Sequence, residues 1–403
     1  MKVTFEDILK ARETLKSVIK ETEVELSHSA SEKWGAPVYF KYENLQRTGS
    51  FKIRGAYNKI ANLSEAEKKR GVVASSAGNH AQGVALSGKL AGVKTTIVMP
   101  ETASLNKISA TKGYGAEVIL HGEIYDDAYA HAKELEKSKG FTFVHPFEDP
   151  LVIAGQGTIG IEILEKIPDL DLIVIPIGGG GLISGIATAI KHLRPQCKII
   201  GVQSAQAPGM NQLFHHQTVT LQTKRISTIA DGIAIKNPSA GMYENFISKL
   251  VDEVVTVTDD EIAEAIVYLL ERAKTVTEGS GAAAMAAMMN RKFPLSKGKN
   301  CILLCGGNID LNIIAKVIER GQIQRGRLAQ ISVIVDDLPG NLNRLTKAIA
   351  DEKANVLEVH HDRVGQGLYL RETRIDFNLE TTSREHVEKI KEALTKAGGR
   401  ILE

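Results

Sequence analysis

The sequence predicts an α/β protein with two mainly parallel sheets, followed by a small ferredoxin-like module. Short β-branched runs alternate with helical patterns from Val38 to about Ile318, as expected of βαβ units. The strands number about nine, which is near the limit of one strongly twisted open sheet, so we expect two sheets. After Ile318 the residues become polar, and the order of strands and helices changes.

The expected strands of the first part are short and rich in Val, Ile and Thr. They are Val38–Tyr42, Val72–Ser75, Thr95–Met99, Glu117–Leu120, Phe141–Val144, Leu172–Ile177, Ile199–Gln203, Val254–Val257 and Cys301–Leu304. Amphipathic helices are expected between them, among others at Ala103–Lys112, Asp126–Ser138, Ile183–Leu193 and Asp260–Ala273. We expect one domain over residues 1–320, with a small subdomain at about 50–146 inserted in the larger one.

The C-terminal part begins with a polar stretch that contains two glycines, and we expect a linker at residues 321–329. Residues 330–403 are expected to form a separate domain. Its predicted elements are strand Ala329–Val335, helix Leu342–Asp351, strand Ala354–His361, strand Gly367–Asn378 and helix Arg384–Ala397. This βαββα order, with a last strand permitted in RILE, predicts the ferredoxin-like fold.

Composition excludes several classes of protein. The chain has 403 residues, 43% hydrophobic and 24% charged, which is typical of a soluble globular protein. The net charge of +2 gives no broad basic field, so we expect neither nucleic acid nor a membrane as a partner. The N-terminal MKVTFEDILKARETL lacks a continuous apolar core and does not resemble a signal peptide. Three cysteines (Cys197, Cys301, Cys305) are too few for a disulfide framework and indicate a cytoplasmic protein.

A lysine stands in the first segment that could carry chemistry, Thr48–Ala56. Lys52 follows Gly-Ser, opens a helix and is flanked by apolar residues. Desolvation there would lower the pKa of its ammonium and make it a candidate Schiff-base lysine. The alternative is a solvated lysine at a helix start, beside Arg54.

A donor-rich turn forms the second segment, Ser75–Gly83, directly after the strand GVVAS. Backbone N–H groups and the side chains of Ser76 and Asn79 at a helix N-terminus would suit a carboxylate. The alternative is an ordinary capped βα turn.

Four consecutive glycines, Gly178 to Gly181, form the third segment, between an apolar strand and a helix. Each costs roughly 0.5–1 kcal/mol relative to alanine in regular structure, so we expect the backbone to wrap closely around a ligand. Repeated amides at a helix N-terminus suit a phosphate. Gln203 stands where a dinucleotide fingerprint has an acidic residue, so a monophosphate is favoured.

Together SFKIRGA, SAGNHAQG and GGGGL resemble the fold-type II pyridoxal-phosphate enzymes, which share the fold of the tryptophan synthase β chain. The resemblance is closest to the threonine dehydratase (threonine ammonia-lyase) branch and covers about residues 1–320. It implies that pyridoxal 5′-phosphate forms a Schiff base with Lys52, packs against Phe51 and bonds through its 3′-hydroxyl to Asn79. It further implies that the phosphate lies on Gly178, Gly179, Gly180, Gly181 and Leu182, and that the substrate carboxylate lies on the turn Ser76, Ala77, Gly78, Asn79 and His80.

Two residues, Cys305 and Ala77, favour one type of reaction within this family. By the resemblance Cys305 lies beside the pyridine nitrogen; the alternative is a small buried core thiol. A neutral thiol cannot keep that nitrogen protonated, which favours elimination over racemisation. Ala77 stands where serine racemases of this fold carry a serine that acts as acid and base. No carboxylate follows Gly201-Val202, and neither His215-His216 nor the spacing of Cys301 and Cys305 suits a metal, so we expect no metal site.

The reaction that the resemblance implies is dehydration and deamination of L-threonine to 2-oxobutanoate and ammonium. L-Serine would give pyruvate in the same way. Lys52 would remove the Cα proton, and Glu278 would lie near the cofactor, unless its carboxylate only caps a helix. Two alternatives are a serine dehydratase or racemase, and a non-catalytic amino-acid sensor on the same scaffold.

The C-terminal module resembles an ACT domain. The resemblance depends on Asp337-Leu338-Pro339-Gly340-x-Leu342 and on Asn355-Val356. Paired ACT domains bind amino acids at the turn from strand to helix, so Gly340 and Asn355 are candidate effector residues of an allosteric enzyme. The alternative is a module for assembly alone. The resemblance also implies a homo-oligomer, a tetramer or a dimer, and leaves isoleucine biosynthesis and threonine catabolism open as pathways.

Overall fold

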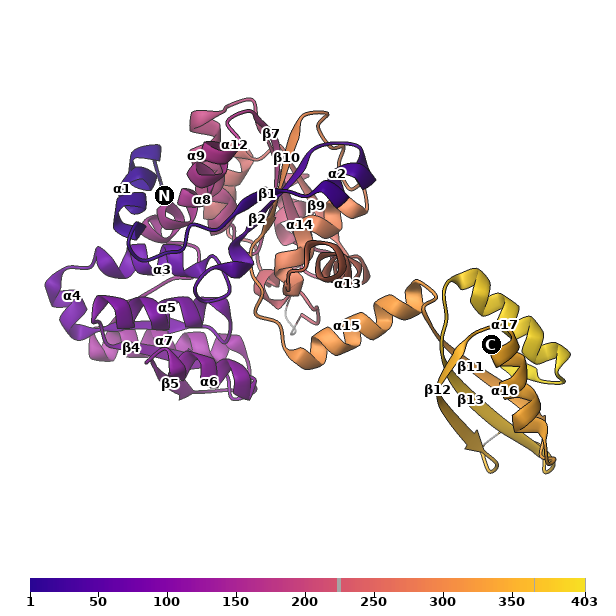
Figure 1. The fold of residues 1–403 in the computed structure, drawn as a ribbon. Helices are drawn as coiled ribbons and strands as arrows, with labels where there is room; N and C mark the ends of the chain where they lie inside the picture. Colours follow the sequence, from indigo (N-terminus) through magenta and orange to yellow (C-terminus); the bar gives the residue numbers. More distant parts are fainter. Residues whose placement is uncertain (223–225, 366, 403) are drawn as a thin grey trace. The chain divides into compact units, whose positions relative to one another are not determined.

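In a computed structural model, the structure describes residues 1–222, 226–365 and 367–402. The chain divides into two compact units, Met1–Asp310 and Leu311–Glu403, which are described separately (Figure 1). No helix in these described residues is long and apolar enough to cross a membrane.

The first unit contains a six-stranded sheet with the strand order β1-β2-β10-β7-β8-β9. Its strands are β1 (Val24–Leu26), β2 (Val38–Tyr42), β10 (Lys299–Leu304), β7 (Leu170–Pro176), β8 (Lys198–Ser204) and β9 (Glu253–Val257). All neighbours are parallel except β1, which pairs antiparallel with β2 at the edge. Strand β1 was not predicted, because its three residues, one half-buried and two exposed, have no apolar pattern.

Helices cover both faces of this sheet, as parallel strands require. One layer contains α1 (Phe5–Leu15), α8 (Pro150–Lys166) and α9 (Gly181–Leu193). The other contains α2 (His28–Trp34), α13 (Asp259–Tyr268) and α14 (Gly279–Met289), as Figure 1 shows. Shorter elements complete this part: η1 (Glu43–Leu45), α10 (Gly209–Phe214), η2 (Asp231–Ile233), α11 (Ala240–Met242), η3 (Tyr243–Ile247), α12 (Ser248–Leu250) and η4 (Leu269–Ala273).

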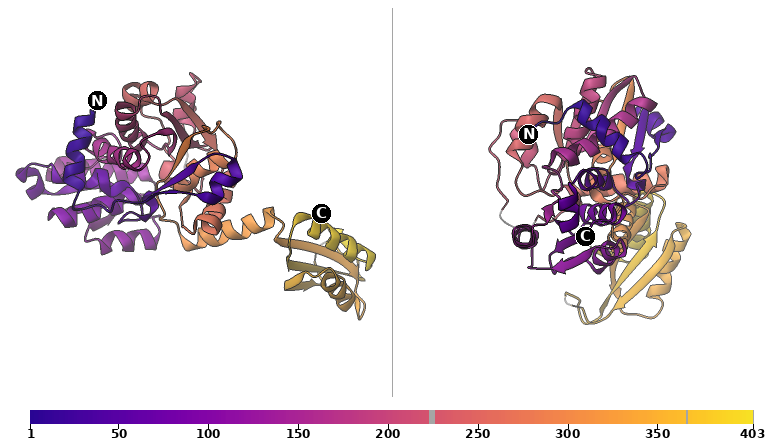
Figure 2. Two further views of the ribbon diagram at one scale, coloured as in Figure 1. Left: turned by 45° about the horizontal axis from the view of Figure 1, so that its top comes forward. Right: turned by 90° about the vertical axis from the view of Figure 1, so that its left-hand side faces the viewer.

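A second, four-stranded sheet has the order β5-β4-β3-β6 and is parallel throughout. Its strands are β3 (Val72–Ser75), β4 (Thr95–Met99), β5 (Glu117–Leu120) and β6 (Thr142–Phe143). The helices around it are α3 (Lys52–Ala61), α4 (Glu65–Arg70), α5 (Asn79–Ala91), α6 (Leu105–Gly113) and α7 (Tyr125–Lys139). Val72 and Ala74 pack in one cluster with residues of α3 and α5, whereas Val73 packs in another with residues of α7. Figure 2 shows two further views of this sheet and its helices. The prediction of two parallel sheets is confirmed.

The second unit is a four-stranded antiparallel sheet of order β12-β13-β11-β14 with helices packed on it. Its elements are α15 (Leu311–Gln324), β11 (Leu328–Asp336), α16 (Asn341–Asp351), β12 (Asn355–Asp362), β13 (Glu372–Glu380), α17 (Arg384–Lys396) and β14 (Arg400–Leu402). The last strand predicted in RILE therefore forms, and its final residue, Glu403, lies outside the described residues.

Three sequence predictions need correction. The linker expected at 321–329 is mostly regular: α15 continues to Gln324, whose carbonyl accepts hydrogen bonds from Arg384, and β11 begins at Leu328. The strand expected from Gly367 begins only at Glu372, because Gly367 has a φ of 89°, outside the β region. The helix expected over 260–273 is α-helical only to Tyr268 and continues as the π-helix η4.

The contact between α8 and α9 gives the first testable prediction. A Cβ at Gly185 would overlap the carbonyl of Ile153 and lie 2.7 Å from the amide nitrogen of Gly157. Because backbone cannot yield as a flexible side chain can, Gly185→Ala should lower the free energy of unfolding by about 1–3 kcal/mol. Chemical denaturation measures this change.

The matched control is Gly113→Ala at the end of α6, where a Cβ would have no neighbour within 4 Å. This substitution should leave the free energy of unfolding unchanged or raise it by about 0.5 kcal/mol. Equal effects of the two substitutions would contradict the close backbone approach of α8 and α9.

Candidate active site

The segments singled out in the sequence meet where parallel strands end. Asn79 begins α5 after β3, Gly181 begins α9 after β7, and Cys305 directly follows β10. Ligands of open α/β sheets bind at such carboxyl ends. Lys52 begins α3 and is brought to the same place by its loop.

Backbone hydrogen bonds join the lysine loop to the end of β10. The Phe51 amide donates to the carbonyl of Cys305 at 3.2 Å, and the Gly307 amide donates to the carbonyl of Gly49 at 2.8 Å. The side chain of Asn308 donates to the carbonyl of Thr48 at 2.7 Å. Gly49 has a φ of 68°, and a side chain there would overlap Asn308. These hydrogen bonds and the close approach of Gly49 to Asn308 therefore hold the lysine loop in place against the end of β10.

The Lys52 side chain is partly buried. Its Nζ donates to the carbonyl of Pro146 at 3.0 Å and lies 5.1 Å from the ring centroid of Phe51. Burial lowers the pKa of Lys52 to about 8, although Cys305 and Glu278 act in the opposite direction. A share of the amine is therefore neutral at physiological pH, as nucleophilic or basic chemistry requires.

The turn before α5 offers donors of different kinds. The Ser76 amide already donates to the carbonyl of Val98 at 3.2 Å, and Ser76 Oγ accepts from the Gly78 amide at 3.2 Å. The amides of the first turn of α5 have no partner within the helix, so they can bind a carboxylate. Ala77 offers only a methyl group and its amide.

His80 lies in this turn, but its ring points elsewhere. Nε2 donates to the carbonyl of Val144 at 2.8 Å, and burial lowers the pKa of His80 to about 3, with Lys52 contributing. The imidazole is therefore neutral and its Nε2 proton is in use, which leaves the backbone amide of His80 for a ligand.

The glycine loop precedes α9, with Gly180 as N-cap at a φ of 99°. A side chain at Gly179 would overlap the ring of Phe147, and a Cβ at Gly181 would lie 2.9 Å from Phe147 Cα. All four glycines were expected to serve a ligand, whereas the packing against Phe147 already requires glycine at positions 179 and 181. The backbone amide of Ser184 donates to the carbonyl of Gly180, and the amides before it have no partner within the helix. They can hold a phosphate.

Glu278 is the N-cap residue of α14, but its carboxylate makes no capping hydrogen bond. Oε1 instead accepts from Asn79 Nδ2 at 2.6 Å and from Ser280 Oγ at 3.2 Å. Burial, with a contribution from Asp231, raises the pKa of Glu278 to about 7. Asn79 in turn accepts from Asn308 at 2.7 Å, so a polar chain crosses the site. The sequence could not predict these partners, which lie more than 190 residues apart.

Cys305 is buried at the end of β10, and its Sγ donates to the carbonyl of Ser280 at 3.5 Å. Burial raises the pKa of this thiol above its usual range, so the thiol stays neutral. Leu182 is also buried, in the same core cluster as Phe51 and Cys305.

Taken together, these residues fit an aldehyde cofactor that carries one phosphate. A desolvated amine can form the covalent bond, amides at the N-terminus of α9 can bind the phosphate, and a neutral thiol lies at the end of β10. The Oγ atoms of Ser50 and Thr277 are buried without a hydrogen-bond partner in the described structure, so polar groups remain to be satisfied here.

Comparisons with known proteins agree with this geometry. Residues 15–306 match the model of a family described as pyridoxal-phosphate dependent enzyme. An L-threonine ammonia-lyase from Thermotoga maritima is 49% identical over 98% of each chain. The solved structure of threonine deaminase isoform 2 from Solanum lycopersicum is 37% identical, covers 80% of this chain and 91% of its own, and superposes with a TM-score of 0.73. Maize serine racemase is 32% identical, with coverages of 80% and 99% and a TM-score of 0.74.

The raised pKa of Glu278 gives a prediction about stability. Between the usual pKa of a glutamate and about 7, the unfolded chain loses this proton while the folded chain keeps it. Stability therefore falls as the pH rises through this window. Glu278→Gln removes that loss, so its free energy of unfolding relative to wild type should rise between pH 5 and 8, by at most roughly 3 kcal/mol.

Denaturant titrations of the cofactor-free proteins at several pH values test this. A difference between variant and wild type that stays constant from pH 5 to 8 would contradict the raised pKa.

Proposed function

Because the chain belongs to the family of pyridoxal-phosphate dependent enzymes, we propose that it is an ammonia-lyase that converts L-threonine to 2-oxobutanoate and ammonium. L-Serine, giving pyruvate, is the second substrate. The relative from Thermotoga maritima, named for the threonine reaction and 49% identical along nearly the whole chain, supports the choice of substrate. The observation that carries the elimination chemistry is the neutral, buried thiol of Cys305, together with the absence of a proton donor on the Ala77 side chain.

The proposed cofactor site uses the residues described above. Pyridoxal phosphate, bound at Lys52, supplies a ring that accepts the electrons of the broken Cα–H bond. The amides of Gly178 to Leu182 would bind its phosphate, Asn79 would bond its ring hydroxyl, and Phe51 would lie beside the ring. Cys305 would lie next to the ring nitrogen.

Lys52 is the proposed base that removes the Cα proton of the substrate. A pKa of about 8 places its amine near the working pH, where general acid–base catalysis is most effective. His80 is a poor base, because burial, with a contribution from Lys52, lowers its pKa to about 3. Glu278, with a pKa of about 7, holds or releases a proton next to Asn79.

The substrate carboxylate is proposed to lie on the turn before α5. The amides at the start of the helix supply donors and a favourable dipole, and Ser76 Oγ, Asn79 and the backbone of Ala77, Gly78 and His80 line the turn. This orientation presents the Cα–H bond to Lys52 without a charged residue at the turn.

A serine racemase is the second candidate, supported by the likeness to the maize enzyme. Racemisation needs a proton donor on the face opposite the base. Ala77 has none, and the neutral Cys305 does not favour a long-lived carbanion, so elimination is the main reaction. A non-catalytic amino-acid sensor is disfavoured, because it would have no use for a desolvated lysine.

For the C-terminal unit we propose amino-acid regulation within a homo-oligomer of ACT-type modules, in the cytoplasm. Gly340, with a φ of 94°, begins α16, and Asn355 follows the far end of that helix, where it donates to Glu380 at 3.3 Å. An 11-residue helix is about 16 Å long, so one small effector cannot touch both residues in one copy. An effector site built from both therefore needs paired copies.

Replacing the proposed base tests the function. Lys52→Ala should abolish the visible absorbance of the lysine-bound cofactor and lower keto-acid formation from L-threonine by at least about a thousandfold, because covalent attachment and proton removal are both lost. The control is Lys68→Ala on α4, a lysine paired with the exposed Glu65. Keto-acid formation at the wild-type rate by Lys52→Ala would sink the assignment.

The absence of a proton donor at the turn gives a prediction about specificity. Ala77→Ser places a hydroxyl there, so the conversion of L-serine to D-serine should rise about tenfold or more. Chiral analysis of the residual serine, with pyruvate measured in the same reaction, gives the ratio of racemisation to elimination. An unchanged ratio in a variant that retains pyruvate formation would show that Ala77 does not suppress racemisation.

A further inference from the structure

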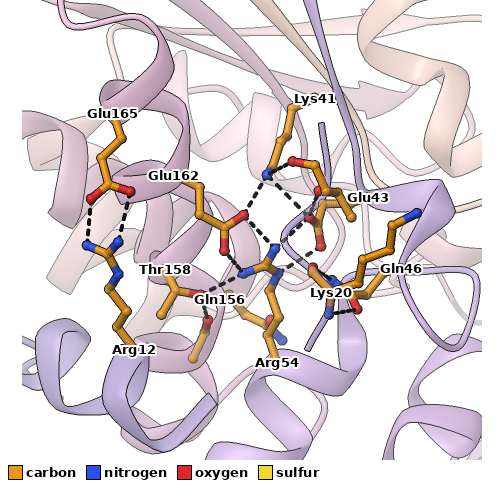
Figure 3. A network of polar contacts seen from close by, with 12 residues as sticks. Arg12, Lys20, Lys41, Glu43, Gln46, Arg54, Gln156, Thr158, Glu162 and Glu165 are labelled. Atoms are coloured by element: carbon orange, nitrogen blue, oxygen red, sulfur yellow. Dashed lines mark hydrogen bonds and ion pairs between the residues drawn. The ribbon is translucent and has the colours of Figure 1, made fainter. Parts of the chain in front are cut away.

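A group of four charged side chains lies buried beneath the lysine-bearing helix, outside the site described so far. This charge cluster consists of Lys41 on β2, Glu43 on η1, Arg54 on α3 and Glu162 on α8 (Figure 3). The side chains of the first three are 0% exposed and that of Glu162 is 9% exposed. None of these four side chains takes a direct part in the reaction proposed for Lys52.

Arg54 uses all five of its N–H groups. Nε and Nη2 donate to the two oxygens of Glu43, both at 2.8 Å. Nη1 and Nη2 donate to the two oxygens of Glu162, at 2.5 and 2.8 Å. The remaining N–H group of Nη1 donates to Thr158 Oγ1 at 3.0 Å. Two bidentate pairs fix both the position and the rotation of a planar guanidinium.

Lys41 completes the charge balance. Its Nζ donates to Glu162 at 2.5 Å and to the carbonyl of Thr22 at 2.7 Å, and Thr22 Oγ1 donates to Glu43 at 2.5 Å. Two cations and two carboxylates make the cluster neutral. Burial opposes the charge on Arg54, but the two carboxylates raise its pKa above its usual range, so it stays charged.

Stability alone does not account for such a cluster. The desolvation of buried charges costs several kcal/mol per ion, and well-packed apolar side chains are often equally stabilising in their place. Apolar packing does not fix the orientation of a helix as firmly as hydrogen bonds do. Hydrogen bonds fix the rotation and axial position of a helix against its neighbours, whereas dispersion contacts leave both adjustable.

The element whose orientation the cluster fixes is α3. Arg54 lies two residues after Lys52, and two residues correspond to about 200° around a helix, so the two side chains leave α3 on opposite sides. Close backbone packing accompanies the cluster: a Cβ at Gly155 on α8 would lie 2.5 Å from the carbonyl oxygen of Arg54. A rotation or shift of α3 that weakened the bonds of Arg54 would therefore also displace the Lys52 side chain.

We propose that the charge cluster is a positioning device, which fixes the rotation and axial position of α3 against α8 and β2 and thereby holds the Lys52 amine in its working place. Arg54, Glu43, Glu162 and Lys41 are thus positioning residues for the reaction. This inference rests on the proposed function of Lys52.

The test is a charge-balanced double variant, Lys41→Met with Glu162→Gln. It removes one cation and one carboxylate, leaves the pair of Arg54 and Glu43, and takes away the carboxylate that binds α3 to α8. In the holoenzyme, kcat for L-threonine should fall about ten- to hundredfold, since a misplacement of about 1 Å can cost two orders of magnitude. The KM should change less than about threefold, and the visible spectrum of the lysine-bound cofactor should shift or broaden.

A matched control pair joins α1 to α8, the helix that carries Glu162. Arg12 and Glu165 form a bidentate pair at 2.9 and 2.7 Å, but their side chains are 40% and 45% exposed (Figure 3). Arg12→Met with Glu165→Gln removes the same kinds of group, and kcat and the spectrum should equal those of the wild type.

A milder variant covers the case in which the double variant does not fold. Thr158→Val removes one hydrogen bond to Arg54 without a change of charge, and kcat should fall about two- to fivefold with an unchanged KM. A wild-type kcat in folded Thr158→Val, or in the folded double variant, would overturn the positioning role. If Lys52→Ala is inactive in the same assay, that result leaves the proposed function intact; an active Lys52→Ala would overturn the function itself.

Discussion

The site depends above all on the backbone hydrogen bonds between the lysine loop and the end of β10. They place Lys52 next to Cys305 although more than 250 residues separate the two in the chain. Once β10 lies between β2 and β7, the glycine loop after β7 and the lysine loop after β2 come to the same edge of the sheet. The polar chain from Asn308 through Asn79 to Glu278 then joins the second sheet to this edge.

Much of this arrangement could be predicted from the sequence, because parallel strands have a plain apolar pattern and the loops that follow them carry the chemistry. The nine predicted strands of the first unit form with small changes at their ends. The partners of Glu278 and the role of Phe147 behind the glycine loop could not be predicted, since they depend on contacts between segments with no pattern in common. The misplaced linker has another cause: polar residues are as compatible with an exposed helix as with a loop, and the hydrogen bonds from Arg384 support the helix.

Burial without a partner charge sets the electrostatics of the active site. It lowers the pKa of Lys52 and of His80, and it raises the pKa of Glu278 and of Cys305. Desolvation, the largest cause in each case, therefore leaves neutral forms of an amine, an imidazole, a carboxyl and a thiol accessible near neutral pH. Such a site can move protons, because its amine and its carboxyl can change their charge at little cost near neutral pH. Elimination of a hydroxyl, which needs proton transfer at two atoms, suits it well.

Helix α3 uses burial in two opposite ways within its first turn. Lys52 is desolvated with no carboxylate bonded to it, so its charge is destabilised and its amine becomes reactive. Arg54 is desolvated with two carboxylates bonded to it, so its charge is held and its position becomes rigid. One amine cannot be both firmly fixed and reactive, because the hydrogen bonds that would fix it also use the lone pair and protons that it needs for the reaction. Placing the fixed charge two residues away from the reactive one resolves the conflict, since the helix backbone transmits the position but not the charge.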